Sequence, residues 1–247
     1  LLLSDMPEKT PFRDALLLIK NSGEKAAAIV QDLLTLARRG VAISTVVNLN
    51  GIIEDYFQSP EFLKLKTYHP NVECNIELKD GLQNIMGSPV HLSKTIMNLI
   101  SNAAEAMPNG GKITIATENR YIDSSLNGFD AVEEGDYATL TVSDRGVGIS
   151  SEDVERIFEP FYTKKVMGKS GTGLGMAVIW GTVKDHNGYI DLKSTEGKGT
   201  TLTLYFPVTR KERIASSPLS AEEFSGNGES ILVVDDVEAQ RDIASEM

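Results

Sequence analysis

Residues 144–175 decide the fold, and they read DRGVGISSEDVERIFEPFYTKKVMGKSGTGLG. Three glycine clusters occur in this stretch, separated by one amphipathic segment. Each glycine costs backbone entropy that packing does not return, so the clusters indicate a backbone that holds a ligand. A glycine-rich loop at the start of a helix presents N–H groups at the positive end of the helix dipole, which favours a phosphate chain.

The last glycine loop, GTGLG at residues 171–175, does not match the two common phosphate loops. It lacks the Gly-Lys-Ser/Thr ending of a P-loop, and its glycines are spaced GxGxG rather than GxGxxG. The rest of the site therefore has to come from other parts of the chain.

The composition is that of an ordinary soluble globular protein, with 41% apolar and 24% charged residues among 247. This length allows one large or two modest domains. The formal charge of −11 argues against broad contact with nucleic acid or anionic lipid. Cys74 is the only cysteine, which excludes an internal disulfide, and three scattered histidines argue against a zinc site.

The sequence contains no apolar run of membrane-spanning length and no recognisable signal peptide. We therefore expect a cytoplasmic location and no membrane segment in this stretch. Anchoring of a longer parent protein upstream stays open.

Hydrophobic periodicity predicts an α+β fold, a two-layer sandwich of a mixed β-sheet with helices on one face. A long helix over residues 11–39 carries an apolar seam wide enough to favour a helical bundle, although packing on its own domain is the alternative. Residues 84–86 are expected to pair with strand 72–78, and the polar stretch 120–136 to be a mobile excursion. The other predicted helices are 49–65, a segment capped by residues 87–89 and running to 107, 150–157 and 172–186. The other predicted strands are 44–47, 112–119, 137–143, 189–194 and 200–207, the last two joined by a turn at 196–199.

Two asparagines in the predicted helix that ends at residue 107 suggest a ligand. Asn98, Asn102 and Glu105 share one face, about a third of a turn from the apolar stripe. Asparagine is a poor helix former, and an amide oxygen suits Mg²⁺, which takes oxygen ligands and usually arrives with phosphates. A solvated helix edge is the alternative.

Asp144 is predicted to lie where a strand ends, followed by Gly146 and Gly148. A carboxylate there can accept a hydrogen bond from an exocyclic amine, and the two glycines allow backbone to approach a flat ring. The alternative is an ordinary turn, because Asp-x-Gly-x-Gly is a common turn sequence.

Four stretches, taken in order, resemble the sequence boxes of one family. They are NLISNAAEA at 98–106 (N box), DRGVGI at 144–149 (first glycine box), FEPFYTKK at 158–165 (F box) and GTGLG at 171–175 (second glycine box). GKGT at 197–200 is similar to the last glycine box. Over residues 49–207 the chain thus resembles the ATP-binding catalytic domain of sensor histidine kinases, within the gyrase-type (Bergerat-fold) ATPase superfamily.

The resemblance implies ATP and Mg²⁺ as cofactors and assigns roles to individual residues. Asp144 binds the adenine amino group, Asn102 coordinates Mg²⁺, and Thr200 is a polar neighbour of adenine. Lys165 contacts phosphate in a lid across residues 166–170, and Gly171, Gly173 and Gly175 cradle the phosphates. Further implied ATP contacts are Glu105, Gly146, Gly148, Ile149, Phe161, Thr172 and Leu174.

Catalysis is implied at Asn98, Asn102 and Lys165. Asn98 stands where gyrase-like relatives carry a hydrolytic glutamate, which favours phosphotransfer to a protein over fast hydrolysis. In such a mechanism the protein contributes positioning and charge neutralisation.

The flanking segments extend the resemblance to a hybrid sensor histidine kinase. Residues 1–43 resemble the second helix of a dimerisation and phosphoacceptor hairpin, 44–208 the ATP-binding domain, 209–229 a linker, and 230–247 the start of a receiver domain with ILVVDD at 231–236. This implies a homodimer through the hairpin, and a receiver domain in cis or a response regulator in trans as phosphoryl acceptor.

The sequence departs from the family pattern in one respect, because none of its three histidines has the setting of a phosphoacceptor. His69 precedes a proline outside any predicted helix, His91 opens one helix and His186 ends another. We therefore expect the acceptor histidine upstream of Leu1, and no autophosphorylation by this fragment alone.

Two other hypotheses stay open. A nucleotide-responsive scaffold would use the ATP domain only to control contacts with a receiver. A DNA-acting gyrase or mismatch-repair ATPase is disfavoured by Asn98, by the net charge and by ILVVDD.

Overall fold

The computed structural model describes residues 12–37, 45–123, 126–127, 129–164 and 172–211, with Leu232, Val234 and Arg241. The chain divides into two compact units, Leu1–Arg213 and Ile214–Met247. Of the predicted receiver strand only Leu232 and Val234 are described, so that prediction is not tested. The fold reported below is that of the first unit.

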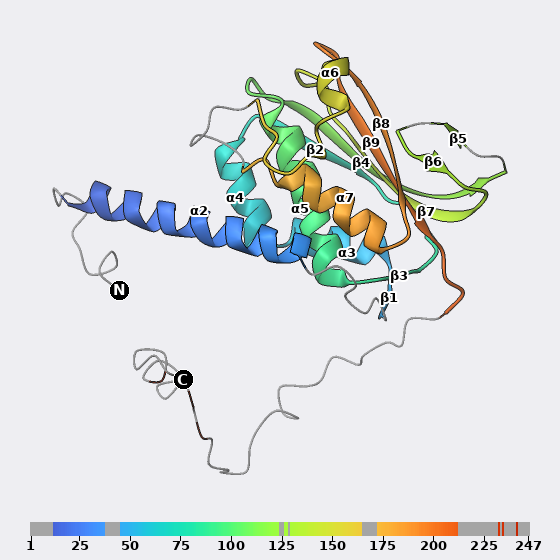
Figure 1. The fold of residues 1–247 in the computed structure, drawn as a ribbon, viewed down its shortest axis with the longest axis horizontal. Coiled ribbons are helices and arrows are strands. Elements are labelled where there is room, and N and C mark those ends of the chain that lie inside the picture. Colours follow the sequence, from blue (N-terminus) through green and yellow to red (C-terminus); the bar gives the residue numbers. More distant parts are fainter. Residues whose placement is uncertain are drawn as a thin grey trace. The chain divides into compact units, whose positions relative to one another are not determined.

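A five-stranded mixed sheet forms one layer of this unit (Figure 1). Its order is β2 (Val72–Glu77), β4 (Gly111–Ile122), β7 (Gly135–Ser143), β9 (Gly199–Pro207) and β8 (Tyr189–Thr195). β2 and β4 are parallel, and the other neighbours are antiparallel. The last two strands form the predicted hairpin, whose turn lies between Thr195 and Gly199.

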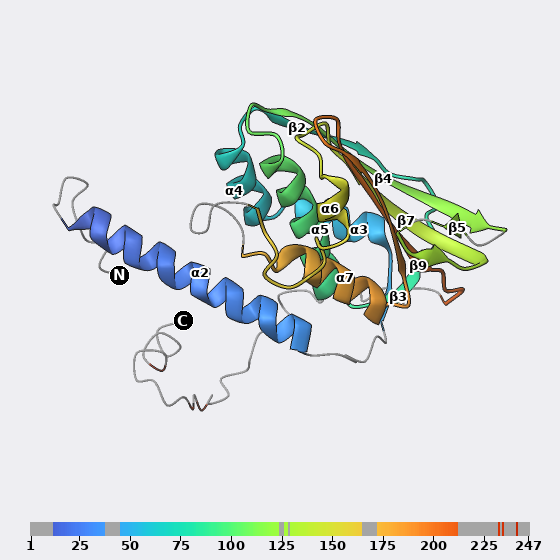
Figure 2. The ribbon, with the colours of Figure 1, turned by 45° about the horizontal axis from the view of Figure 1, so that its top comes forward.

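The second layer consists of helices that cover one face of the sheet (Figures 1 and 2). It contains α3 (Leu49–Phe57), α4 (Pro60–Tyr68), α5 (Pro89–Glu105), the short α6 (Ser151–Val154) and α7 (Gly175–Asp185). The apolar stripe predicted for α5 is buried between the layers, and its members are Leu92, Ile96, Leu99, Ala103 and Met107. The predicted α+β sandwich is confirmed.

The single helix predicted over residues 49–65 is wrong, because the chain breaks it into α3 and α4. Ser59 caps α4 by accepting a hydrogen bond from the Phe62 N–H at 3.3 Å. Pro60 follows as the first helical residue, where its missing N–H costs nothing. An apolar periodicity that runs through a Ser-Pro pair therefore belongs to two helices.

The predicted pairing of residues 84–86 with the strand at 72–78 is also wrong. β3 (Ile85–Gly87) instead pairs antiparallel with β1 (Thr45–Val47) in a separate two-stranded sheet. The Asn48 amide nitrogen donates to the Leu82 carbonyl at 2.8 Å and to Asn84 Oδ1 at 3.1 Å. These side-chain bonds hold the segment before β3 beside the end of β1.

Regular structure extends further into the polar stretch 120–136 than predicted. β4 continues to Ile122 and β7 begins at Gly135, and β5 (Leu126–Asn127) pairs with β6 (Ala131–Val132) between them. A second apolar cluster, separate from the main core, supports these extensions. Its buried members are Ile122, Val132, Tyr137 and Tyr205.

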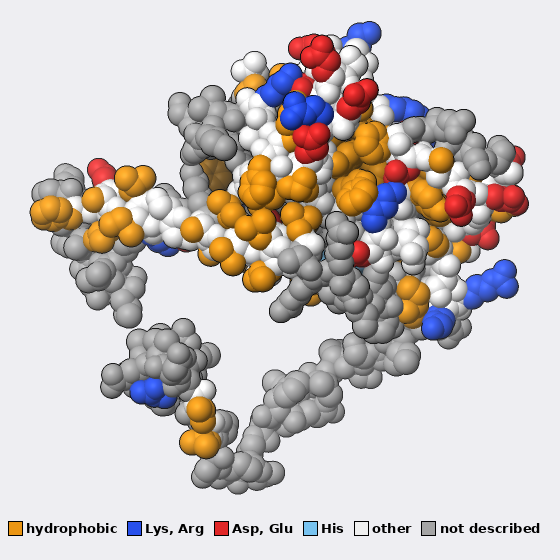
Figure 3. Space-filling view, viewed as in Figure 1, with side chains coloured by type: hydrophobic (Ala, Val, Ile, Leu, Met, Phe, Trp, Pro, Cys, Tyr) orange, Lys and Arg blue, Asp and Glu red, His pale blue; other side chains and the backbone are white. Residues whose placement is uncertain are grey.

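The N-terminal helix α2 (Arg13–Ala37) leaves much of its apolar seam uncovered. Leu18 is 68% and Ile19 67% exposed, and Figure 3 shows hydrophobic side chains along the visible face of this helix. Near its C-terminal end α2 packs on the domain, where buried Asp32 forms an ion pair with Lys94 of α5 at 3.1 Å. Among the helices that the structure describes, none has the length and apolar character needed to span a bilayer.

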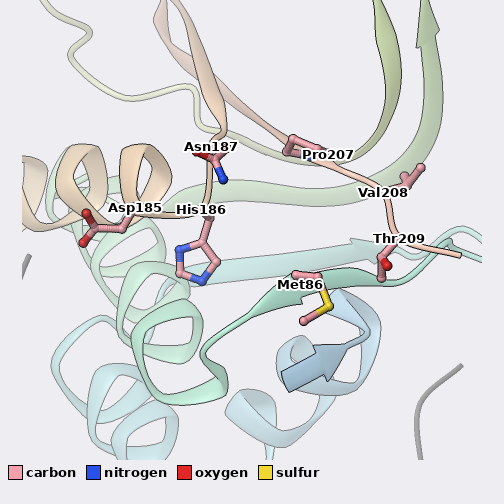
Figure 4. Close-up of a pocket in the computed structure, with 7 residues that line it drawn as sticks. All are labelled: Met86, Asp185, His186, Asn187, Pro207, Val208 and Thr209. Atoms are coloured by element: carbon pink, nitrogen blue, oxygen red, sulfur yellow. The ribbon is translucent and has the colours of Figure 1, made fainter. Parts of the chain in front are cut away.

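His186 joins the end of α7 to the start of α5. Its ring is 4% exposed and faces β3 and the end of β9 (Figure 4). The Ser88 N–H donates to His186 Nε2 at 3.0 Å, so the proton of the neutral ring is on Nδ1, which donates to the Thr182 carbonyl at 2.6 Å. Ser88 is the N-cap of α5, so this imidazole fixes one helix against the other.

This junction predicts a loss of stability at mildly acidic pH. Burial lowers the pKa of His186, and the nearby His91 adds to this, against Asp185 and the Thr182 carbonyl, which raise it. The unfolded chain takes up the proton near the ordinary pKa of 6.5, before the folded protein does. Above that pH the ring is neutral in both states, and His186 contributes its full stabilisation to the folded protein. As the pH falls below 6.5, protonation favours the unfolded chain, so the free energy of unfolding should decline.

Urea denaturation between pH 8 and pH 5.5 measures this effect. The His186→Gln variant should be less stable at pH 8 and should lose less stability than the wild type on acidification. If the free energies of unfolding of the wild type and of His186→Gln differ by the same amount at every pH in this range, His186 does not contribute in this way.

Candidate functional site

The two asparagines of the N box face the beginning of α7. Asn98 Nδ2 donates to the Gly175 carbonyl at 3.4 Å, and Asn102 Nδ2 donates to Met176 Sδ at 3.3 Å. Because the nitrogens are turned toward α7, the amide oxygens are the atoms left to accept or to coordinate. Glu105, one turn further along α5, accepts from the Ser101 hydroxyl at 3.5 Å.

The N-terminus of α7 has no side-chain cap. Leu174 occupies the N-cap position and is completely buried. Thr172 Oγ1 accepts from the Leu174 N–H at 3.2 Å, which shapes the loop just before the helix. No side chain that the structure describes thus balances the positive end of the helix dipole, and a bound anion would suit this position.

Asp144 follows β7 and is fixed by the neighbouring strand. Its N–H donates to the Thr200 carbonyl at 2.8 Å, the Thr200 N–H donates back at 3.3 Å, and the Gly146 N–H donates to its Oδ1 at 2.8 Å. Burial raises the pKa of the Asp144 carboxyl, and the backbone hydrogen bonds from Gly146 and Thr200 oppose that rise. A buried carboxylate held in this way is a suitable acceptor for an amine.

Ser194 is a member of this cluster that the sequence did not reveal. Its hydroxyl lies 2.9 Å from Thr200 Oγ1 and accepts from the Ile149 N–H at 2.8 Å. It thus connects the segment after β7 with the start of β9. A serine in an alternating strand carries no signal for this role.

The glycines after Asp144 are required by contacts within the protein. The Val147 N–H donates to the Ala106 carbonyl at 3.0 Å, which brings Gly146 against the end of α5. Gly148 has a φ of 67°, and a Cβ there would collide with the Thr195 carbonyl. These contacts explain the glycines without an approaching ring, so their presence alone does not indicate adenine.

The F box contacts the second glycine box through backbone. Phe161 has a φ of 66°, which is unusual for a residue with a side chain, and its N–H donates to the Gly173 carbonyl at 2.9 Å. Its ring is 56% exposed beside this contact. Lys165 and Gly171 lie outside the described residues.

A carboxylate network fixes the F box from the other side. Asp153 of α6 forms an ion pair with Lys164 at 2.5 Å and accepts from the Tyr162 hydroxyl at 2.5 Å. Hydrogen bonds from Lys164, Tyr162 and Ser150 lower the pKa of Asp153 to about 2. The guanidinium of Arg156 lies over the Tyr162 ring, 4.3 Å from its centroid.

Helix α5 brings these groups together. Asn98 and Asn102 contact the start of α7, and Ala106 at the end of α5 contacts the loop after Asp144. Asn98 and Ala106, the C-cap residue, are eight positions apart along α5, a rise of roughly 12 Å. The amide oxygens, the uncapped helix and the buried carboxylate are therefore arranged along one rigid element.

Two cavities occur in the described unit, and the second is lined in part by Ser194 and Gly199, beside Thr200. One of about 440 Å³ is lined by Met86, His186 and Val208 among others (Figure 4), and one of about 520 Å³ lies between α6 and the β8–β9 turn. None of the predicted ATP contacts lines either cavity.

The residues present fit a nucleotide and a hard cation. No cluster of three or more His, Cys, Asp or Glu side chains arranged for a metal ion occurs in the part of the chain that the structure describes. Magnesium that arrives with phosphates needs few protein ligands, so one amide oxygen from Asn102 is compatible with it. The uncapped start of α7 suits the phosphates, and Asp144 suits the base.

Comparison with known proteins assigns this arrangement to a family. The profile described as "Histidine kinase-, DNA gyrase B-, and HSP90-like ATPase" matches residues 87–210. Sensor kinase CckA of Brucella abortus (strain 2308) is 32% identical over 251 residues, which cover 98% of this chain and 26% of CckA. The chain spans about a quarter to a third of the curated relatives that it matches.

Solved structures have the same fold. The nucleotide-free catalytic domain of histidine kinase ThkA matches with a TM-score of 0.53 and 26% identity, covering 67% of this chain and 95% of that one. Full-length ShkA, in complex with AMPPNP, matches with a TM-score of 0.63 and 21% identity over 88% of this chain and 43% of its own. This chain belongs to the histidine kinase-, DNA gyrase B- and HSP90-like ATPase family, and its catalytic unit is the ATP-binding domain of a histidine kinase.

Proposed function

We propose that this chain is the catalytic core of a hybrid sensor histidine kinase. It transfers the γ-phosphoryl group of ATP to a histidine N-terminal to Leu1, from which the group passes to a receiver aspartate. The observation that carries the proposal is the contact of Asn98 and Asn102 with the uncapped start of α7. Transfer of a phosphoryl group depends on positioning and on charge neutralisation. In this contact the start of α7 would position the phosphates, and the asparagine amide oxygens would hold the neutralising cation.

In this proposal each group of the site has one task. Asp144 accepts the adenine amino group with Thr200 beside it, Asn102 holds Mg²⁺, and Gly173 with its neighbours cradles the phosphates. Bound Mg²⁺ neutralises part of the phosphate charge. Lys165, by virtue of its place in the F box, contacts phosphate. The remaining proposed ATP contacts are Glu105, Gly146, Gly148, Ile149, Phe161, Gly171, Thr172, Leu174 and Gly175.

The histidines of this chain support an acceptor elsewhere. His186 is buried, and both of its ring nitrogens are hydrogen-bonded. His69 is the C-cap residue of α4, and His91 lies in the first turn of α5. None of them lies on α2, the helix proposed to belong to the phosphoacceptor hairpin.

The flanking segments support the dimeric, hybrid organisation. The exposed apolar residues of α2 suit a bundle with other helices, and we propose residues 1–43 as half of a dimerisation hairpin. Residues 44–208 are the catalytic domain, 209–229 a linker and 230–247 the start of a receiver. The division of the chain after Arg213 falls inside this proposed linker. The similarity to CckA covers 98% of the chain and so extends into both flanks.

The function is tested by joining the chain to the segment that precedes it in its parent protein. With Mg–ATP labelled at the γ position, the extended protein should acquire phosphate that is labile to acid and stable to alkali, as expected for phosphohistidine. Asn102→Ala should abolish the labelling. ATP binding without any label would favour a scaffold, and DNA-stimulated hydrolysis would favour a gyrase-type ATPase.

ATP binding tests the proposed site directly. Asp144→Asn should weaken binding about tenfold, because a neutral amide replaces the charged acceptor. Asn102→Ala should reduce the affinity measured with Mg²⁺ to that measured with a chelator. Isothermal titration with ATP measures both effects. Asp80→Asn and Asn75→Ala, which change the same residue types at positions away from the site, should bind as the wild type does. Unchanged affinity in both site variants would refute the assignment.

Gly173 and Gly81 form a matched pair for testing the phosphate loop. Their φ angles are 71° and 68°, but a Cβ at Gly173 would lie 2.7 Å from the Phe161 backbone, whereas one at Gly81 would meet nothing within 4 Å. Gly81→Ala should lower the free energy of unfolding by about 1 kcal/mol without changing ATP affinity. Gly173→Ala should be less stable than that and should also bind ATP more weakly. Equal behaviour in urea denaturation and ATP titration would contradict the role of this contact.

A further inference from the structure

The connection between β4 and β7, residues 123–134, crosses the edge strand β8. The Asp130 N–H donates to the Ile190 carbonyl at 3.1 Å, and Asp130 Oδ2 accepts from the Ile190 N–H at 2.8 Å. One residue thus pairs both outward-facing backbone groups of Ile190. This protects the edge of the sheet at Ile190, whose backbone groups would otherwise be open to another strand.

The same carboxylate also holds the last turn of α7. Lys184 Nζ lies 2.6 Å from Asp130 Oδ2, with both side chains largely removed from solvent. The lysine ammonium is also 5.5 Å from the centroid of the Tyr189 ring. Asp130 is therefore fixed to a strand and to a helix at once, and its neighbours in the connection are positioned accordingly.

The residue before Asp130 reaches the F box. The ring of Phe129 lies 4.8 Å from that of Phe158, centroid to centroid, with a 54° angle between the planes. Phe158 is partly buried against the main core, whereas Phe129 is 36% exposed and covers it from outside. Protection of the strand edge requires Asp130 but does not require this aromatic contact.

Phe158 begins the segment that contacts the phosphate loop. Three residues later the Phe161 N–H donates to the Gly173 carbonyl, and the two backbones are in direct contact. The interactions therefore form a chain that runs from the loop before the first turn of α7 to its last turn, and α7 itself closes the circuit. Its members in order are Gly173, Phe161, Phe158, Phe129, Asp130 and Lys184.

We propose that Phe129 and Asp130 are positioning residues that hold residues 158–161 against the glycine loop before α7 and thereby set the affinity for ATP. The inference rests on the ATP site proposed above. Neither residue belongs to a sequence box of the family. Their effect passes through Phe158 and the Phe161–Gly173 contact.

The expected effect is measurable. An aromatic pair contributes an amount that corresponds to roughly 2- to 10-fold in an equilibrium constant, so Phe129→Ala should weaken ATP binding by up to that factor. Phe129→Tyr keeps the ring and should restore binding. Asp130→Asn removes the charge that holds Lys184 and should also weaken binding. A purely structural role would lower the stability of these variants and leave the ATP affinity unchanged.

The experiment is ATP titration with Mg²⁺ on the whole chain, with urea denaturation of each variant in parallel. Tyr121→Ala is the matched control, since Tyr121 lies in β4 just before the same connection, is 61% exposed, and bonds Glu134 rather than the F box. Weaker binding by Phe129→Ala and Asp130→Asn, with rescue by Phe129→Tyr and no change in Tyr121→Ala, supports the inference.

Two results would overturn it, and they are distinguishable. Wild-type affinity in both Phe129→Ala and Asp130→Asn, while the wild type itself binds ATP, overturns this inference alone. A wild-type chain that binds no ATP overturns the proposed function together with it. If Phe129→Ala does not fold, Phe129→Leu keeps the apolar volume without the ring and is read in the same way.

Discussion

The candidate site depends on a backbone contact between Phe161 and Gly173. The two segments are so close that only glycine fits at position 173, and Phe161 itself adopts a positive φ. A residue with a side chain in this conformation carries strain on the order of 1–3 kcal/mol, so the surrounding structure has to hold it. Asp153 does so from one side through Tyr162 and Lys164, which bind its carboxylate. The F box is therefore a fixed platform for the glycine loop.

Helix α5 gives the site its rigidity because it is held at several points along its length. His186 bonds the backbone at its N-cap, the asparagine amides contact α7 in its middle, and the loop after Asp144 bonds the carbonyl of Ala106 at its end. A helix held in this way cannot rotate about its axis without breaking several of these bonds. Preorganised polar groups of this kind lower the reorganisation needed when a charged substrate binds.

The sequence was sufficient to predict the layers and most of the elements, because the apolar periodicity of a helix or a strand can be recognised without knowing which element it packs against. The sequence-based prediction failed where the pairing of a strand or the end of a helix depends on hydrogen bonds from particular side chains. The Asn48 amide supports the pairing of β3 with β1 by bonding the segment before β3, and the break at Ser59 is made by a helix cap that the apolar periodicity does not reveal. Within the site, motifs revealed Asp144 and the asparagines. Ser194, His186 and Phe129 act through contacts with residues distant in the chain, and local sequence does not encode such contacts.

The second apolar cluster, which supports residues 123–134, has a consequence for the motion of this connection. Its buried residues, Ile122, Val132, Tyr137 and Tyr205, form a group distinct from the main core, and segments with few buried neighbours open locally at a lower free energy than the domain as a whole. We therefore expect the contacts of Phe129 and Asp130 to open at a lower free energy than the sheet itself. Changes in this one loop are then expected to alter how firmly the glycine loop before α7 is held and to leave the sheet intact.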